Sequence, residues 1–101
     1  MLRIEDIRTL FSNNTIVLTE HLLSRIRQRN IRLEDIKQAV VNSEIIEQYP
    51  TDYPFPSCLI NWKNIHIVCS IGDMELYIIT AYWPSPERRE DRGRKRKEKK
   101  S

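Results

Sequence analysis

The chain has 101 residues, of which 40% are hydrophobic and 31% are charged, which is enough for one small globular domain and too little for two. No apolar run approaches the roughly 18 residues that a membrane-spanning helix needs, and the N-terminus lacks the apolar stretch of a signal peptide. We therefore expect a cytoplasmic protein that does not bind a membrane.

The net charge of +3 is unevenly distributed along the chain. Residues 87–101 contain nine basic and four acidic side chains, whereas residues 1–86 contain eight basic and ten acidic ones. We predict a single domain over residues 1–86, followed by a basic, disordered tail over residues 87–101. A basic tail can bind phosphate groups by displacing counterions, which makes Arg88 and Arg89 candidate contacts. Alternatively, the tail only keeps the protein soluble.

Apolar residues follow helical spacing at the start of the chain, at positions 4, 7, 10 and 11, which predicts a first helix over residues 2–11. Residues 15–19 are rich in β-branched side chains, and they form either a strand or an extended lead into the next helix. Thr19 is a suitable N-cap for that second helix, which should end near Asn30, a residue type that tolerates a left-handed conformation.

A third helix is predicted directly after residue 32, with acidic residues in its first turn, where they suit the helix dipole. Its buried side should consist of Leu33, Ile36, Ala39 and Val40. From residue 44 onward the pattern changes to one typical of strands. We predict four strands, over residues 44–49, 57–60, 65–71 and 75–83, with a hairpin turn at Gly72-Asp73.

Helices therefore precede an antiparallel meander. This order predicts an α+β fold, with the N-terminal helices packed on one face of a four-stranded antiparallel β-sheet, while the other face is free to carry a functional surface. Cys58 and Cys69 lie in apolar strands and should be buried, reduced thiols. Because there is no Cys/His cluster, P-loop or dinucleotide-binding motif, we expect no metal and no small-molecule cofactor.

Three candidate functional side chains, His21, Arg25 and Arg29, repeat every four residues in the second predicted helix. This spacing places them in one stripe beside the apolar face, and Arg27 and Arg32 add positive charge nearby. A guanidinium group can hold a phosphate through two hydrogen bonds and keeps its charge. The same pattern is also typical of an ordinary polar helix face.

Two further groups of candidates lie on the predicted strands. Alternation places Thr80 and Tyr82 on one face at the end of the last strand, and a tyrosine hydroxyl can bind or protonate a phosphate oxygen. His66 is a polar residue in an apolar strand, and imidazole transfers protons near neutral pH. Each of these residues also has a structural explanation, as a hydrogen-bonded core histidine or as an aromatic ring that closes the core.

The register of the last hairpin decides whether these strand residues can act together. With a two-residue loop at Gly72-Asp73, His66 pairs with Ile79 and faces away from Thr80 and Tyr82. With a three-residue loop over residues 72–74, His66 pairs with Thr80 and shares its face. A slip of one residue reverses the face of every side chain, and both registers remain open.

Several motifs occur along the chain in an order that is known from one protein family. They are His21-x-x-x-Arg25-x-x-x-Arg29, Glu34-Asp35-Ile36, Glu44-Ile45-Ile46-Glu47-x-Tyr49-Pro50, Tyr53-Pro54-x-Pro56-Ser57-Cys58-Leu59, Ile65-His66-Ile67-Val68 and Ile78-Ile79-Thr80-Ala81-Tyr82-x-Pro84. Over about residues 19–86, the chain thereby resembles a family of short bacterial proteins of unassigned function that is grouped with the RelE-like and barnase-like toxins.

The resemblance implies a barnase/RelE-like fold and a toxin-type, metal-independent endoribonuclease of a type II toxin–antitoxin system. In that reaction a ribose 2′-hydroxyl attacks the adjacent phosphate, leaving a cyclic phosphate and a 5′-hydroxyl. The implied catalytic residues are those of the matching motifs, His21, Arg25, His66, Thr80 and Tyr82.

The expected partners are RNA and a cognate antitoxin protein. The RNA would be bound by five arginines, Arg27, Arg29, Arg32, Arg88 and Arg89. The alternative is a module of the same fold that binds RNA or a protein without catalysis.

Overall fold

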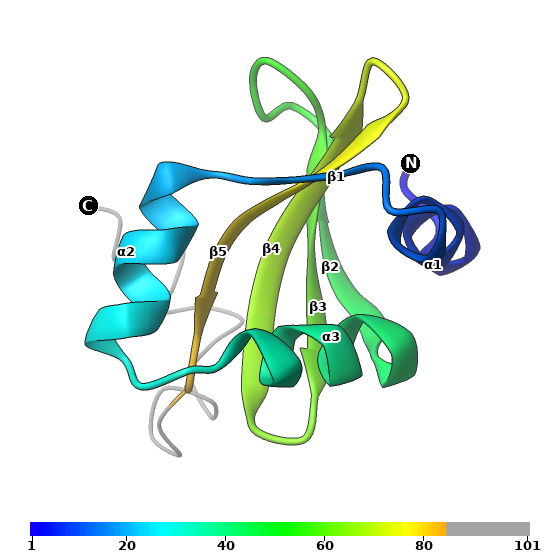
Figure 1. The fold of residues 1–101 in the computed structure, drawn as a ribbon. Helices are drawn as coiled ribbons and strands as arrows, with labels where there is room; N and C mark the ends of the chain where they lie inside the picture. Colours follow the sequence, from blue (N-terminus) through cyan, green and yellow to red (C-terminus); the bar gives the residue numbers. More distant parts are fainter. Residues whose placement is uncertain (85–101) are drawn as a thin grey trace.

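The computed structural model describes residues 1–84, so the predicted tail, with Arg88 and Arg89, lies outside the described residues. The helices are α1 (Ile4–Ser12), α2 (Glu20–Gln28) and α3 (Leu33–Asn42), and the strands are β1 (Ile16–Leu18), β2 (Glu44–Tyr49), β3 (Ser57–Trp62), β4 (Ile65–Gly72) and β5 (Glu75–Tyr82) (Figure 1). Over the part of the chain that the structure describes, none of the helices is long and apolar enough to cross a membrane.

The strands form one five-stranded mixed sheet with the order β1-β5-β4-β3-β2. β2 to β5 make the expected antiparallel meander, but β1 pairs in parallel with β5 and places Ile16 opposite Leu76. The prediction of a four-stranded, purely antiparallel sheet was therefore wrong. Residues 16–18 form a strand because the outer edge of β5 offers backbone groups that need partners, and the Leu76 N–H accordingly donates to the Thr15 carbonyl over 2.9 Å.

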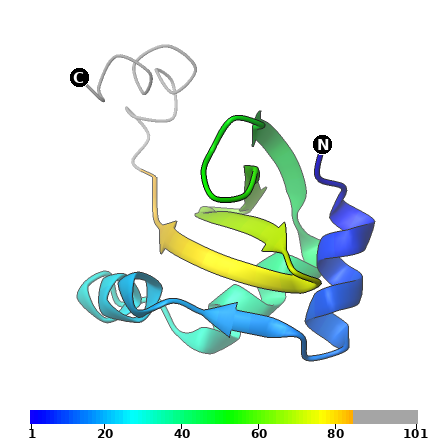
Figure 2. The same cartoon turned by 90° about the horizontal axis from the view of Figure 1, so that it is seen from above.

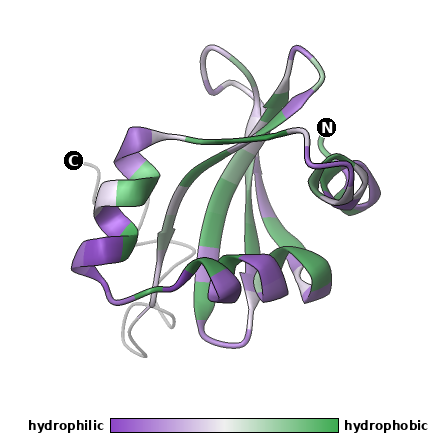
Figure 3. Ribbon diagram, in the orientation of Figure 1, coloured by the Kyte–Doolittle hydropathy of each residue, from purple (hydrophilic) through white to green (hydrophobic). Residues whose placement is uncertain are grey.

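One face of the sheet packs against the helices and forms the hydrophobic core. The core draws buried side chains from each helix and from alternating positions of the strands, among them Ile7, Leu22, Ile26, Ile36, Val40, Ile60, Ile67, Leu76 and Ile78. Figure 1 shows α3 crossing the sheet and α2 standing beside β5, and Figure 3 shows that each helix carries both apolar and polar residues. Ala39 is buried as predicted, but Leu33 is 53% exposed, so its assignment to the buried side of α3 was wrong.

The predicted ends of α2 are confirmed. The backbone N–H of Leu22 donates to the Thr19 hydroxyl oxygen over 3.0 Å, and Asn30 adopts a left-handed conformation with a φ of 59°. At the start of α3, the backbone N–H of Arg32 donates to the Asp35 carboxylate over 2.9 Å. This acidic side chain satisfies one backbone donor at the helix start, although position 32 lacks a capping side chain of the usual type.

The last hairpin turns one residue later than predicted. Its loop consists of Asp73 and Met74, which both have a positive φ, as in the turns that two-residue hairpins favour. Gly72 remains in β4 because the Phe55 ring packs directly on it, so closely that a Cβ atom at this position would lie 2.3 Å from the ring. The glycine therefore serves a close contact and not the turn.

Neither predicted register of this hairpin was right. Cys69 lies opposite Ile78, but a β-bulge follows, and Val68 lies opposite Thr80. A bulge inserts one extra residue into one strand, which here is Ile79. From there on the pairing continues in the shifted register to the end of β5.

Candidate functional site

The sheet face opposite the core, termed the open face, carries several of the predicted strand residues. The strand pairing places Tyr82, His66, Asn61 and Glu44 in one row across β5, β4, β3 and β2. Directly paired residues point to the same face of a sheet, so these four share the open face. Figure 2 shows α3 on one side of the strands and the segment of residues 50–56 on the other.

The segment of residues 50–56 covers the hairpin end of the open face. The ring of Phe55 lies 6.0 Å from the ring of Tyr77, centroid to centroid, and the Ser57 hydroxyl donates to the Asp52 carboxylate. Tyr77 lies near the start of β5, whereas Tyr82 is its last residue. The cover and the row of His66 therefore lie at opposite ends of the open face.

His66 and Tyr82 form the centre of the candidate site. Nδ1 of His66 lies 3.3 Å from the Tyr82 hydroxyl oxygen, and the two rings meet edge to face with centroids 5.3 Å apart. His66 is 1% exposed, while Tyr82 is half-buried. Either group can be the donor, depending on the imidazole tautomer, so this pair can pass a proton between two side chains.

A positive charge from α2 lies beside this pair. Nη1 of Arg29 donates to the Ala81 carbonyl over 2.9 Å, and the Arg29 guanidinium carbon lies 6.0 Å from the centroid of the Tyr82 ring. A second hydrogen bond runs in the opposite direction, from the indole N–H of Trp83 to the Arg29 carbonyl over 2.9 Å. A guanidinium has five N–H donors, so Arg29 keeps donors for an anion while it holds the end of β5.

Thr80 also lies on the open face, opposite Val68 and one row from Tyr82. Two residues along a strand span about 7 Å, so the half-buried Thr80 hydroxyl is a neighbour of the pair. The structure thus brings together His66, Thr80, Tyr82 and Arg29 at the end of β5.

The remaining helix candidates lie elsewhere. His21 is exposed in the first turn of α2, about 12 Å along the helix axis from Arg29. Nη1 of Arg25 donates to Gln28 over 3.0 Å, and the exposed Arg32 pairs loosely with Asp35. Arg27 is exposed as well. Of the predicted helical stripe, Arg29 is the member for which residues 1–84 show a contact with the site.

The open face also carries side chains that were not among the predicted site residues, including Glu47, Tyr49 and Asn61. The Tyr49 hydroxyl donates to the Glu47 carboxylate on β2, and Asn61 lies directly beside His66. Glu44 and Glu47 are possible bases by residue type, but a β-bulge between Ile45 and Glu47 brings Glu44, Glu47 and Tyr49 to one face, which strict alternation does not predict. Asn61 lies beyond the strand predicted over residues 57–60, but β3 continues to Trp62 and the turn occupies Lys63 and Asn64.

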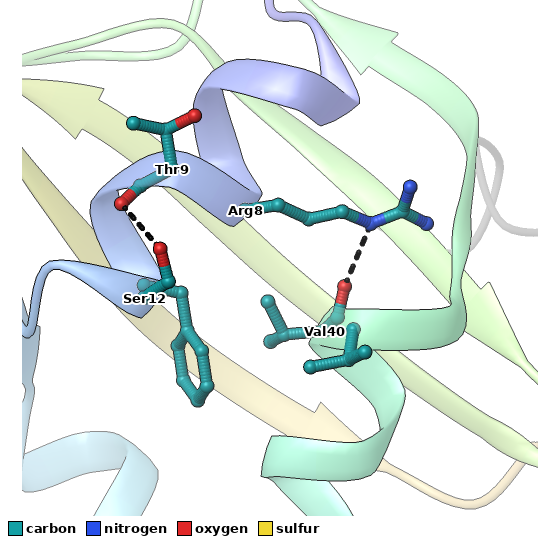
Figure 4. Close-up of a pocket in the computed structure, with 6 residues that line it drawn as sticks. Arg8, Thr9, Ser12 and Val40 are labelled. Atoms are coloured by element: carbon teal, nitrogen blue, oxygen red, sulfur yellow. Dashed lines mark hydrogen bonds between the residues drawn. The ribbon is translucent and has the colours of Figure 1, made fainter.

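A hollow lies between α1 and α3 (Figure 4). It has a volume of about 280 Å³ and is lined by Arg8, Thr9, Phe11, Ser12, Val40 and Val41. The Arg8 guanidinium donates to the carbonyls of Val40 and Ser43, so it satisfies acceptors at the end of α3. We assign this hollow to the packing of two helices.

The cysteines behave as predicted. Cys58 and Cys69 are free thiols and are buried in the core, with their sulfur atoms 3.9 Å apart. The hydrogen bond with Cys58, together with burial, raises the pKa of the Cys69 thiol. Within residues 1–84, no group of three or more His, Cys, Asp or Glu side chains could hold a metal ion.

Comparison with known proteins identifies a family for this region. A family model described as "Domain of unknown function (DUF4258)" matches residues 18–83, a range that includes α2, β4 and β5 and so the whole candidate site. Neither the curated proteins nor the solved structures contain a significant match.

Proposed function

The chain belongs to the DUF4258 family, and we propose that it is a metal-independent endoribonuclease whose reacting groups are His66 and Tyr82. The observation that carries the proposal is the 3.3 Å approach of the His66 imidazole to the Tyr82 hydroxyl on the open face. The guanidinium of Arg29 beside the Tyr82 ring adds the positive charge that a phosphate group requires.

The proposed reaction uses the ribose itself as the nucleophile. The 2′-oxygen bonds to the adjacent phosphorus, the bond from phosphorus to the next 5′-oxygen breaks, and the products carry a 2′,3′-cyclic phosphate and a 5′-hydroxyl. One proton leaves the 2′-hydroxyl and one is gained by the 5′-oxygen, so the site needs a base and an acid. Imidazole serves in both roles near neutral pH. Because His66 is 1% exposed and contacts the half-buried Tyr82 hydroxyl, we assign proton transfer to the pair: the Tyr82 hydroxyl gives its proton to the 5′-oxygen, and His66 takes up the proton that leaves the 2′-hydroxyl and returns it to Tyr82.

The other residues of the site suit the charge that develops on the phosphate. The Tyr82 hydroxyl can donate to a phosphate oxygen, while the Arg29 guanidinium stabilises the negative charge in the transition state. Thr80 offers a further hydroxyl on the same face. The half-buried Tyr82 ring can also stack on an unpaired base, which makes single-stranded RNA the substrate that the site fits best.

Incubation of the purified protein with a labelled single-stranded RNA in EDTA tests this proposal. We expect fragments with 2′,3′-cyclic phosphate ends, detected by mass spectrometry, and we expect Tyr82→Phe to reduce their formation because it removes only the hydroxyl. The same RNA with 2′-O-methyl riboses should resist cleavage, since it lacks the nucleophile. Cleavage of the methylated RNA, or no cleavage of the unmodified RNA, would contradict the mechanism.

We further propose that the protein acts as the toxin of a type II toxin–antitoxin system and is related to the RelE-like and barnase-like toxins. The motifs of residues 19–86 support this relationship, as do a histidine and a tyrosine paired on the sheet face opposite the core. A cognate antitoxin would inhibit the enzyme by covering the open face, where an acidic segment would complement Arg29.

Growth assays test the toxin proposal separately. Expression of the protein should arrest bacterial growth, and co-expression of the neighbouring gene should restore it. His66→Gln should abolish the arrest while the protein remains folded. Equal arrest by the wild type and by His66→Gln would favour a non-catalytic binding module.

A further inference from the structure

Two hydrogen bonds join the end of β5 to the end of α2, one on each side of Tyr82. We propose that Arg29 and Trp83 form a clamp that positions the Tyr82 hydroxyl against His66, so that Trp83 is a positioning residue of the site. This inference rests on the proposed function for its effect on catalysis, but the clamp itself consists only of hydrogen bonds within the chain.

The clamp lies at the end of β5, beyond the residues that pair with β1. β1 pairs with β5 only as far as Leu18 opposite Ile78. Beyond that point α2 takes over this edge: the Thr19 hydroxyl lies 3.2 Å from the Ile79 carbonyl oxygen, and Nη1 of Arg29 lies 2.9 Å from the Ala81 carbonyl oxygen. The carbonyls at this edge of the sheet thereby accept hydrogen bonds from the N-cap and the C-cap residue of α2.

Trp83 closes the clamp from the other side. Its indole N–H donates to the carbonyl of Arg29 over 2.9 Å, although its side chain is 44% exposed. Arg29 thus bonds the residue before Tyr82 through its side chain and the residue after Tyr82 through its backbone. An exposed Trp whose single polar atom is bonded to the C-terminal end of a helix contributes orientation as well as packing.

Orientation matters here because Tyr82 is the last residue of β5 and pairs with His66 at the second residue of β4. Ends of strands fray more readily than their centres. A displacement of a reacting group by about 1 Å can cost a large part of the rate. The two bonds on either side of Tyr82 fix its backbone at this point, and the Arg29 guanidinium lies over its ring.

The decisive variant is Trp83→Phe, which keeps an aromatic ring and removes the indole N–H. Loss of one hydrogen bond of this kind corresponds to a factor of about 3 to 10, and we expect that fall in kcat on single-stranded RNA with KM unchanged. Trp62→Phe is the matched control, since Trp62 lies at the end of β3 and pairs with Ile65. Arg29→Lys and Arg29→Gln separate charge from geometry: if Arg29 contributed charge alone, the lysine variant would restore activity and Trp83→Phe would have no effect.

A second readout does not depend on RNA. In NMR spectra of the free protein, Trp83→Phe should shift the His66 imidazole signals, and Trp62→Phe should change them far less. If Trp83→Phe lowers the Tm while kcat and the His66 signals stay unchanged, the tryptophan only stabilises the fold and the proposal is overturned. If the wild type cleaves no RNA, the proposed function fails, and the His66 signals alone decide whether the clamp exists.

Discussion

The two faces of the sheet share the same strands but differ in what their side chains do. Along β4, Ile67 and Cys69 enter the core, whereas His66, Val68 and Ser70 line the open face. On the core side the buried residues of the strands are apolar. On the open face His66 and Ser70 are buried polar groups, which cost free energy unless they are hydrogen-bonded. The core face therefore contributes mainly to stability, whereas the open face carries the candidate functional groups.

The largest expected effect tests the open face through its histidine. His66→Gln should lower RNA cleavage by a factor of about 100 or more, because a proton-transferring side chain contributes that much. Cleavage rates at neutral pH measure this effect, and unfolding curves should show a far smaller change.

The other histidine of the chain is the matched control. His21 lies at the opposite end of α2 from the site, and we expect His21→Gln to cleave RNA nearly as well as the wild type. A loss of activity as large as that of His66→Gln would instead place His21 in the reaction, as the family resemblance implies.

The next largest effect tests the core face on the same strand. Ile67 is fully buried, so Ile67→Ala should reduce the free energy of unfolding by about 2–5 kcal/mol, through lost burial and the cavity left behind. Urea denaturation measures this change. Its neighbour Val68 is half-buried on the open face, and Val68→Ala should cost clearly less; an equal loss would show that the two faces contribute alike to stability.

A smaller effect is expected where α2 joins the sheet. The Thr19 hydroxyl accepts from the Leu22 N–H and lies near the carbonyls of Ile78 and Ile79. Thr19→Ala should therefore cost about 1–2 kcal/mol, the upper part of the range for an N-cap. Thermal unfolding measures it against Thr9→Ala, an exposed position in α1. If both variants unfold alike, the cap contributes no measurable stability.

The smallest effect concerns the core thiols. The hydrogen bond between the two sulfurs raises the pKa of Cys69 and lowers that of Cys58, so it is burial that keeps both thiols from reacting. We expect no alkylation of the folded protein by iodoacetamide, as judged by mass spectrometry, and full alkylation in urea. Rapid modification in the absence of denaturant would show that the core face opens.

Local features of the fold could be predicted because short-range patterns determine them. The cap at Thr19, the left-handed Asn30 and the buried cysteines each follow from a residue and its near neighbours. The parallel pairing of β1 with β5 could not be predicted in this way. It joins three residues to a partner that lies 60 positions later, and no local pattern encodes such a contact.

The site was predicted in its parts and not in its arrangement. His66 and Tyr82 were recognisable as polar groups on strands, but their contact depends on two features outside the hairpin's own pattern. The turn lies one residue later than predicted, with the Phe55 ring packed on Gly72, and the bulge at Ile79 shifts the pairing by one more residue. Both are tertiary effects, which explains why alternation alone left the register open.

The pairing of β1 with β5 also bears on how the protein is made. The parallel ladder joins Ile16 to Leu76, so the N-terminal strand has no partner until most of the chain has emerged from the ribosome. Contacts between distant parts of a chain also slow folding, because a long loop must close first. During synthesis β1 therefore stays unpaired until β5 has left the ribosome. The site at the end of β5 also forms only after that strand has emerged.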